Sequence, residues 1–259
     1  MGLLLCALLF GPPAGAHDFW LEPDRFRVDG ETPVAVTLRV GQQFKGESVP
    51  YVADWIDRFE IHDGEGVRAI TAQIGDDPAG RVAPRAPGAA WIAYQSRDDF
   101  VVLDPDKFRD YLVMEGMEFI LPLRDARGLA ARPAREYYVR CVKSLLWWPG
   151  GQGVEVARPL GLTLEIVPQT NPYLQAVDGT LEVRVLHEGR PVPGLLVKAF
   201  TREAPDSEQR QRTDADGRAT VTLDRTGTWI VKTVHMVAVE DDPHGEWRSY
   251  WASLTFAAP

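Results

Sequence analysis

The sequence contains very little cysteine: of its 259 residues, only Cys6 and Cys141 are cysteines. Cys6 lies in an N-terminal apolar stretch that we predict is removed, which leaves Cys141 alone in the mature chain. A single cysteine excludes an internal disulfide and a metal site built from several thiolates. A packed core must therefore stabilise the fold, and we expect Cys141 to lie in that core as a small apolar side chain.

Several catalytic motifs are absent as well. The sequence has no nucleophile elbow, no glycine pattern that binds phosphates or dinucleotides, and no His-Glu-x-x-His motif. After residue 16 no apolar run is long enough for a transmembrane helix, so we expect no stable membrane insertion. The formal net charge of −9 disfavours nucleic acid as a partner and favours cations. We predict that the protein is not an enzyme.

Residues 1–16 have the features of a secretory signal peptide. The first ten residues are apolar and uncharged, too short a run to cross a bilayer as a helix. Ala14-Gly15-Ala16 then provides the small-x-small pattern that signal peptidase cuts. A lipoprotein signal ending at Cys6 is disfavoured, because Leu5 is bulky where a small residue is needed. We predict cleavage after Ala16 and a periplasmic or secreted protein that begins with His17.

Short runs of alternating apolar and polar residues, separated by Gly, Pro and Asp turns, predict a mainly β protein. Two β-hairpins are expected at 25–41 and 58–70, and two strands about a turn at 180–200. Further strands are expected at 90–96, 135–148, 161–167, 213–223, 227–239 and 247–256. One helix is predicted within 103–116, where Asp104 can cap, Pro105 fits the first turn and Gly116 suits the end.

A polar segment flanked by Pro168 and Pro172 predicts a linker at 168–173. It divides the mature chain into an N-terminal β-rich domain, 17–167, which holds the short helix, and a C-terminal domain, 174–259. Both domains are expected to be antiparallel β-sandwiches. The turn at 214–217 is expected to join strands rather than to bind calcium, because a calcium loop needs a distal Glu and flanking helices.

Five stretches of the chain resemble a known family: "AHDFWLEP", "GLTLEIVPQTNPY", "RTDADGRATVTL", "TGTWIVKTVHM" and "WRSYWASLTF". They are similar to secreted bacterial proteins grouped as domain of unknown function 4198, and the resemblance spans nearly all of the mature chain. Members are often labelled periplasmic components of cobalt or nickel uptake systems. The resemblance therefore implies nickel or cobalt as the bound ion and an inner-membrane metal transporter as a partner. The C-terminal domain resembles prealbumin-like and carboxypeptidase-regulatory sandwiches.

A free His17 terminus would offer two nitrogen donors to one metal ion. Its α-amine and imidazole Nδ1 can close a six-membered chelate, and Asp18 adds an oxygen. An unperturbed α-amine titrates near pH ~7.7–8.0, so a metal displaces its proton at little cost in neutral solution. Amine and imidazole donors suit nickel, cobalt, copper and zinc.

The resemblance implies a second ligand, since His17 and His235 align with a recurrent terminal His and a "vHM" motif of the family. His244 and Asp242 are further candidates, because a hairpin can fold them towards His235. We therefore predict a divalent transition-metal site formed by His17, His235, His244 and Asp242. Nickel or cobalt is the expected ion, with copper or zinc as alternatives, and binding is expected to cross-link the two domains.

Three alternatives stay open. In the first, His17 is an uninvolved frayed terminus and His235 a hydrogen-bonded core histidine. In the second, His17 belongs to the histidine brace of a copper-dependent oxidative enzyme, with aromatic residues as a sugar-stacking platform. We expect Trp20, Trp247 and Trp251 to pack in the core instead. In the third, the chain is a structural or docking module without metal.

Three other side chains carry expectations. His62 and His187 adjoin Gly-containing turns and are expected at the surface. Lys143 shares a strand face with Cys141, and a core-facing lysine requires a carboxylate partner. The candidates for that partner are Glu136, Glu165 and Asp104.

Overall fold

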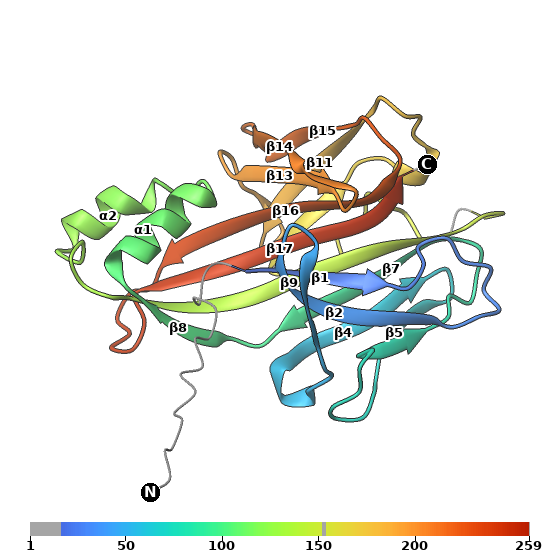
Figure 1. The fold of residues 1–259 in the computed structure, drawn as a ribbon, viewed down its shortest axis with the longest axis horizontal. Helices are drawn as coiled ribbons and strands as arrows, with labels where there is room; N and C mark the ends of the chain where they lie inside the picture. Colours follow the sequence, from blue (N-terminus) through green and yellow to red (C-terminus); the bar gives the residue numbers. More distant parts are fainter. Residues whose placement is uncertain (1–16, 152–153, 259) are drawn as a thin grey trace, which may run out of the picture.

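The computed structural model describes residues 17–151 and 154–258, so the predicted signal peptide and its cleavage site lie outside the described residues. The described residues form many strands and two α-helices, which confirms the mainly β class (Figure 1). The strands are β1 (Asp18–Pro23), β2 (Val34–Gln42), β3 (Lys45–Val49), β4 (Ile56–Asp63), β5 (Gly66–Ala69), β6 (Gly80–Val82), β7 (Gly88–Ser96), β8 (Asp99–Leu103), β9 (Ala134–Trp148), β10 (Leu164–Pro168), β11 (Gly179–His187), β12 (Arg190–Pro191), β13 (Leu196–Thr201), β14 (Ala204–Arg212), β15 (Arg218–Leu223), β16 (Gly227–Ala238) and β17 (Trp247–Ala258). The helices are α1 (Pro105–Met114), α2 (Ile120–Ala126) and the short 3-10 turns η1 (Ala53–Trp55) and η2 (Pro172–Leu174).

A nine-stranded sheet, the central sheet, runs through the molecule in the order β14-β13-β16-β17-β9-β7-β4-β5, with β8 beside β9. Strands β17 and β9 are parallel, whereas the other pairs of this sheet are antiparallel. Because β9 and β17 come from the two predicted domains, the central sheet crosses the boundary placed at 168–173. Backbone hydrogen bonds therefore join the two halves into one sheet.

Two smaller sheets cover the central sheet. The β11 sheet (β10, β11, β12 and β15) packs on one face, and the β2 sheet (β1, β2, β3 and β6) packs on the other. Alternation along β9 feeds both cores, since Cys141 and Leu145 face the β11 sheet while Val142 and Leu146 face the β2 sheet. Helices α1 and α2 cover the rest of the second face, at one end of the molecule (Figure 1). None of the helices among the described residues is long and apolar enough to span a membrane.

The predicted helix is confirmed as α1, with Pro105 in its first turn. Asp104 occupies the cap position, although its side chain caps no described backbone amide. Gly116 follows the helix with φ +73°, a left-handed conformation that glycine adopts without strain. We expected one helix in the N-terminal half of the chain, but a second helix, α2, begins a few residues after α1 ends.

The two strands expected about a turn at 180–200 do not pair with each other. Strand β11 pairs with β10, β12 and β15, whereas β13 pairs with β14 and β16. The turn thus carries the chain from the β11 sheet to the central sheet. The segment predicted as a linker is packed: Pro168 ends β10, and the buried Tyr173 donates its hydroxyl to the carbonyl of Leu145 at 2.5 Å.

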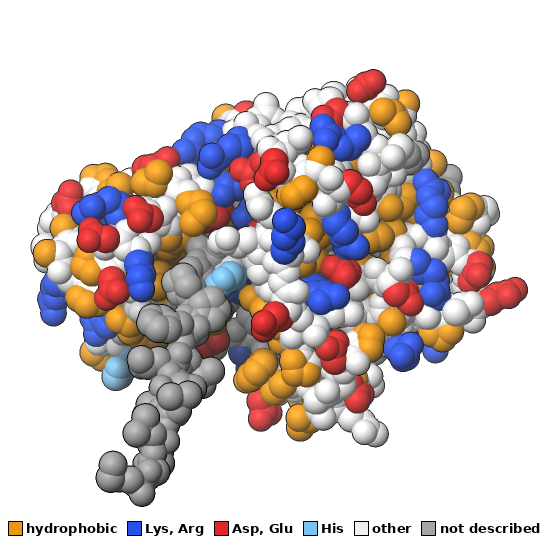
Figure 2. All heavy atoms as spheres, in the orientation of Figure 1, with side chains coloured by type: hydrophobic (Ala, Val, Ile, Leu, Met, Phe, Trp, Pro, Cys, Tyr) orange, Lys and Arg blue, Asp and Glu red, His pale blue; other side chains and the backbone are white. Residues whose placement is uncertain are grey.

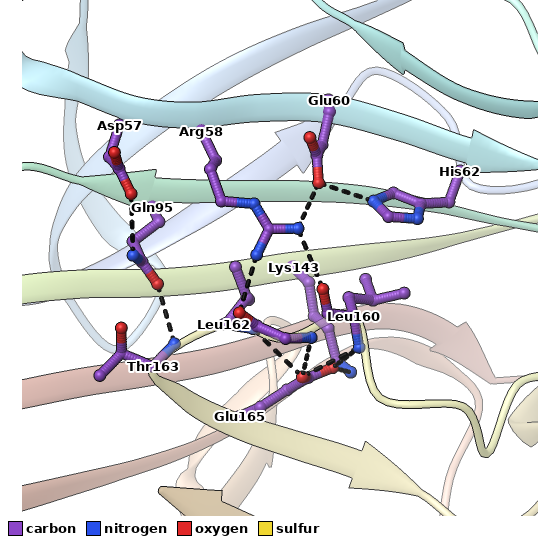
Figure 3. Close-up of polar contacts among 11 residues, drawn as sticks. Asp57, Arg58, Glu60, His62, Gln95, Lys143, Leu160, Leu162, Thr163 and Glu165 are labelled. Carbon is purple, nitrogen blue, oxygen red and sulfur yellow. Dashed lines mark hydrogen bonds and ion pairs between the residues drawn. The ribbon is translucent and has the colours of Figure 1, made fainter. Parts of the chain in front are cut away.

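A buried ion pair fixes the connection between β9 and β10 (Figure 3). Lys143 Nζ lies 2.6 Å from Glu165 Oε1, and both side chains are 1% exposed. The carboxylate also accepts backbone N–H groups from residues 160–162. The prediction that Lys143 requires a carboxylate is confirmed, with Glu165 as the partner. Cys141 is buried, as expected.

His62 is buried, so its expected surface position is wrong. The residue is 4% exposed, and its Nε2 lies 2.8 Å from Glu60 Oε1. Glu60 also pairs with Arg58, which reaches across to the carbonyls of residues 160 and 161 (Figure 3). The expectation that Trp20, Trp247 and Trp251 pack in the core is confirmed, since all three are buried.

Candidate functional site

A pocket of about 250 Å³ lies beside His17, the first described residue. Strands β8 and β9 each supply three of its lining residues, and β2, β17 and helix α1 supply one each. Its lining residues are His17, Val40, Phe100, Val101, Leu103, Tyr111, Glu136, Tyr138, Arg140 and Trp251.

Acidic and basic side chains are interspersed over the molecular face shown in Figure 2, so this face carries no large patch of positive or negative charge.

The backbone around His17 is held in place by buried polar contacts. Arg140 Nη1 donates to the His17 carbonyl at 2.7 Å. Asp18, the next residue, is buried and forms an ion pair with Lys232 of β16. Glu115 lies 3.6 Å from Lys232 and 3.0 Å from Lys198. These contacts position His17. We expected Asp18 to offer an oxygen to a metal ion, but its carboxylate forms an ion pair with Lys232 instead.

Glu136 is the acidic group of the pocket. It is 2% exposed, and its Oε1 accepts hydrogen bonds from Tyr111 at 3.1 Å and from Ser249. Its Oε2 is buried without a hydrogen-bond partner among the described residues. Burial raises the pKa of Glu136 to about 7, because the surrounding apolar groups disfavour the carboxylate. The carboxyl is therefore poised to lose its proton near neutral pH.

Aromatic rings fix the remaining polar lining. Tyr111 and Trp251 stack with ring centroids 5.4 Å apart. The Arg140 guanidinium lies 4.8 Å from the Trp251 centroid and 5.0 Å from that of Tyr138. Tyr138 donates its hydroxyl to Asp99. Arg140 is thus held between two rings with its hydrogen bond directed at the backbone of His17.

His235 lies on the other face of the central sheet. It pairs with Tyr250 and shares its strand face with Trp229 and Val231, which pack against the β11 sheet. Lys232, the partner of Asp18, points to the opposite face. The structure therefore separates His17 and His235 by the thickness of the sheet and does not bring them into one site.

His244 and Asp242 lie in the connection between β16 and β17. Asp242 Oδ1 accepts the backbone N–H of His244 at 2.7 Å, and its Oδ2 accepts the Tyr137 hydroxyl at 3.2 Å. These hydrogen bonds, the His244 backbone bond first, lower the pKa of Asp242. Neither residue lines the pocket of His17. The described residues contain no group of three or more His, Cys, Asp or Glu side chains arranged to hold a metal ion.

His235 instead meets His187, which we expected at the surface. The two ring centroids are 4.8 Å apart at an interplanar angle of 69°. His187 is partly buried, and burial lowers the pKa of both rings, that of His235 to about 4. No local sequence signal indicates this pair, because His187 and His235 belong to different sheets.

The fold and its pocket define a three-layer, mainly β protein with a small pocket beside the start of its first strand, in which His17, Glu136 and Arg140 lie among apolar and aromatic side chains. The chain belongs to the family described as domain of unknown function (DUF4198), whose model matches residues 14–237. This match confirms the resemblance seen in the sequence. No curated protein matches the chain.

Two solved structures show distant similarity. The D0-D1 domain of intimin has 14% identity, with 92% of this chain and 97% of that chain covered, and a TM-score of 0.21. Dimeric latent PorU from Porphyromonas gingivalis has 9% identity, with 96% of this chain but 21% of that chain covered, and a TM-score of 0.20.

Proposed function

We propose that the mature protein binds one divalent transition-metal ion in the pocket of His17 and assists metal uptake or homeostasis in the periplasm. The α-amine and imidazole Nδ1 of His17 supply two donors, and Glu136 Oε2 supplies the third. Nickel or cobalt is the proposed cargo, because family members carry that label, and copper or zinc fits the same donors.

The unpartnered oxygen of Glu136 carries this proposal. A buried acceptor without a hydrogen bond costs about 1–3 kcal/mol, more when it is charged. Glu136 Oε2 is such an acceptor among the described residues, and its carboxylate lines the same pocket as His17. A bond to a cation would satisfy this oxygen and offset the cost of ionising the carboxyl group.

The charge of the lining favours a transition metal over a hard cation. Glu136 and Arg140 are its one acidic and one cationic side chain among the described residues. Calcium takes six to eight oxygen ligands, several of them anionic, and this lining does not supply them. Nitrogen donors bind late transition ions through coordinate bonds that depend less on net charge.

The acid-base properties of the donors support release as well as capture. Glu136 has a pKa of about 7, and an α-amine titrates at about 7.7–8.0. Both groups must lose a proton to bind metal, so affinity falls as the pH drops below neutral. A weakly held ion suits transfer to an inner-membrane metal transporter, the partner that the resemblance implies.

The oxidative alternative requires a second imidazole beside the terminal histidine. Among the described residues that line the pocket, His17 is the only histidine. The aromatic side chains that would form a sugar-stacking platform are largely buried: Trp20, Trp247 and Trp251 are 1%, 0% and 7% exposed. Metal capture therefore accounts for more of the geometry.

The test compares two chains that differ by one acetyl group. The first begins at His17 with a free α-amine, and in the second that amine is acetylated, which converts it into an amide. Calorimetric titration with nickel should show one site in the first chain that binds about 100-fold more weakly in the second, a difference of about 2.7 kcal/mol. Equal affinity of the two chains would rule out the terminal chelate.

A further inference from the structure

His187 and His235 face each other across two layers of the fold. His187 is the last residue of β11, in the β11 sheet, and His235 lies within β16, in the central sheet. Their ring centroids are 4.8 Å apart. With metal–nitrogen bonds of about 2.0–2.1 Å, two imidazoles on one tetrahedral ion have centroids roughly 5 Å apart. The observed separation already matches that spacing.

Each of the two rings has a buried nitrogen without a partner. These atoms are His187 Nε2 and His235 Nδ1, and neither has a hydrogen bond to any described residue. An unpaired buried polar atom destabilises the fold, and native structures contain few of them. Two such atoms on neighbouring imidazoles indicate that the partner is something other than the protein chain.

We propose that His187 and His235 together bind one late divalent transition-metal ion, at a site separate from the pocket of His17. Each unpartnered nitrogen donates its lone pair to the ion, while the other nitrogen of the ring carries the proton. Water completes the coordination. Imidazole donors suit copper, nickel, zinc and cobalt rather than calcium or magnesium, and copper is expected to bind most tightly.

The surroundings provide access and do not repel the ion. His235 lines a second pocket, of about 490 Å³, together with Leu195, Glu118 and Arg212. The Arg212 guanidinium pairs with Glu118 at 3.0 Å, which balances its charge. The Tyr250 ring lies 4.7 Å from His187 and closes the other side.

This site would cross-link the two layers that its ligands occupy. Because the ion binds the folded chain, it stabilises the fold by an amount that grows with the concentration of free metal. The site shares no residue with the pocket of His17 and lies on the opposite face of the central sheet. It therefore does not depend on the function proposed above.

The test uses the His17→Ala chain, in which the terminal chelate cannot form. One equivalent of Cu²⁺ is added, and pulsed electron paramagnetic resonance counts the coordinated imidazoles through their remote nitrogens. The expected result is two imidazoles on one ion. A spectrum with one imidazole or none would overturn the proposal, and this readout needs no substitution in the site.

Substitutions then assign the two ligands. In the His17→Ala chain, His187→Gln and His235→Asn should each weaken Zn²⁺ binding by at least about tenfold and abolish the rise in melting temperature that Zn²⁺ causes. His244→Gln is the matched control, because this exposed histidine lies in a turn, and it should bind as the parent does. Unchanged binding in both site variants would contradict the proposal. If the pocket of His17 fails to bind nickel while His187 and His235 still bind metal, the function proposed above is wrong and the present proposal holds.

Discussion

Replacement of Glu136 by glutamine tests whether burial controls the acid in the pocket of His17. Glutamine keeps a carbonyl oxygen to accept the hydrogen bonds of Tyr111 and Ser249, but it cannot ionise. Burial raises the pKa of Glu136 from 4.5 to about 7. The protonated carboxyl group is thus stabilised by folding, and the carboxylate is destabilised.

The sign of the pH effect follows from this direction. Below the unfolded pKa the group is protonated in both states and costs the fold nothing. As the pH rises through 4.5 towards 7, the unfolded chain loses this proton first, and the free energy of unfolding falls. A shift of this size corresponds to about 3 kcal/mol. That amount should be lost between about pH 4 and about pH 8 in the parent but not in the Glu136→Gln variant.

The assay is urea unfolding of both chains in the presence of a chelator, across this pH range. The relevant quantity is the difference in unfolding free energy between the variant and the parent, because other titrating groups cancel in it. We expect the variant to gain on the parent by about 3 kcal/mol from the acidic to the basic end. Parallel pH profiles would refute the reasoning, since they would show that Glu136 ionises as freely in the folded chain as in the unfolded one.

Other predictions concern the core and the connections. Lys143→Met should lower the free energy of unfolding by about 3–5 kcal/mol, because Glu165 stays buried without its ion-pair partner. Adding Glu165→Gln to this variant should recover part of the loss. Additive effects of the two substitutions in urea unfolding would contradict an energetic coupling between Lys143 and Glu165. Gly116→Ala should lower the free energy of unfolding by more than about 1 kcal/mol, since φ is +73° and the added Cβ would lie 2.5 Å from the Leu196 Cβ. An unchanged melting temperature would contradict this prediction. The Cys141 thiol, whose pKa burial raises to about 12, should not react with a thiol reagent until the chain unfolds, and rapid labelling of the native protein would show that it is accessible.

Local patterns predicted the parts of the fold that depend on neighbouring residues. The strand over 135–148 followed from alternation, and β9 spans Ala134–Trp148. The helix followed from Pro105 and Gly116, which mark its ends. The buried lysine and its need for a carboxylate followed from the strand face that Lys143 shares with Cys141.

Pairings between distant segments were not predictable in this way. The parallel contact of β9 with β17 joins residues more than 100 positions apart, Glu136 opposite Trp247, and no local pattern specifies it. This contact merges the two predicted domains into one sheet. The switch of the chain from the β11 sheet to the central sheet also depends on tertiary packing, so the turn at 180–200 resembled an ordinary hairpin.

The sequence singled out one residue of the candidate pocket. The leader junction singled out His17, and the structure places it in a pocket. Glu136 was considered only as a partner for Lys143, although alternation along one strand puts these residues on opposite faces. The odd sequence separation of Glu136 and Lys143 was the signal that could have placed Glu136 on the opposite face of the strand from Lys143. The His187–His235 pair had no such signal, because it arises where two sheets pack.

The most direct test of metal capture at His17 is native mass spectrometry of protein that carries His187→Gln and His235→Asn, so that the second proposed site cannot hold metal. The protein is exported to the periplasm and measured with and without one equivalent of nickel. The account predicts a mass that begins at His17 and retains one nickel ion, together with loss of that ion in the Glu136→Gln and His17→Ala variants. A chain that begins at His17 and retains no nickel, or one that keeps it in both variants, would contradict the proposed site.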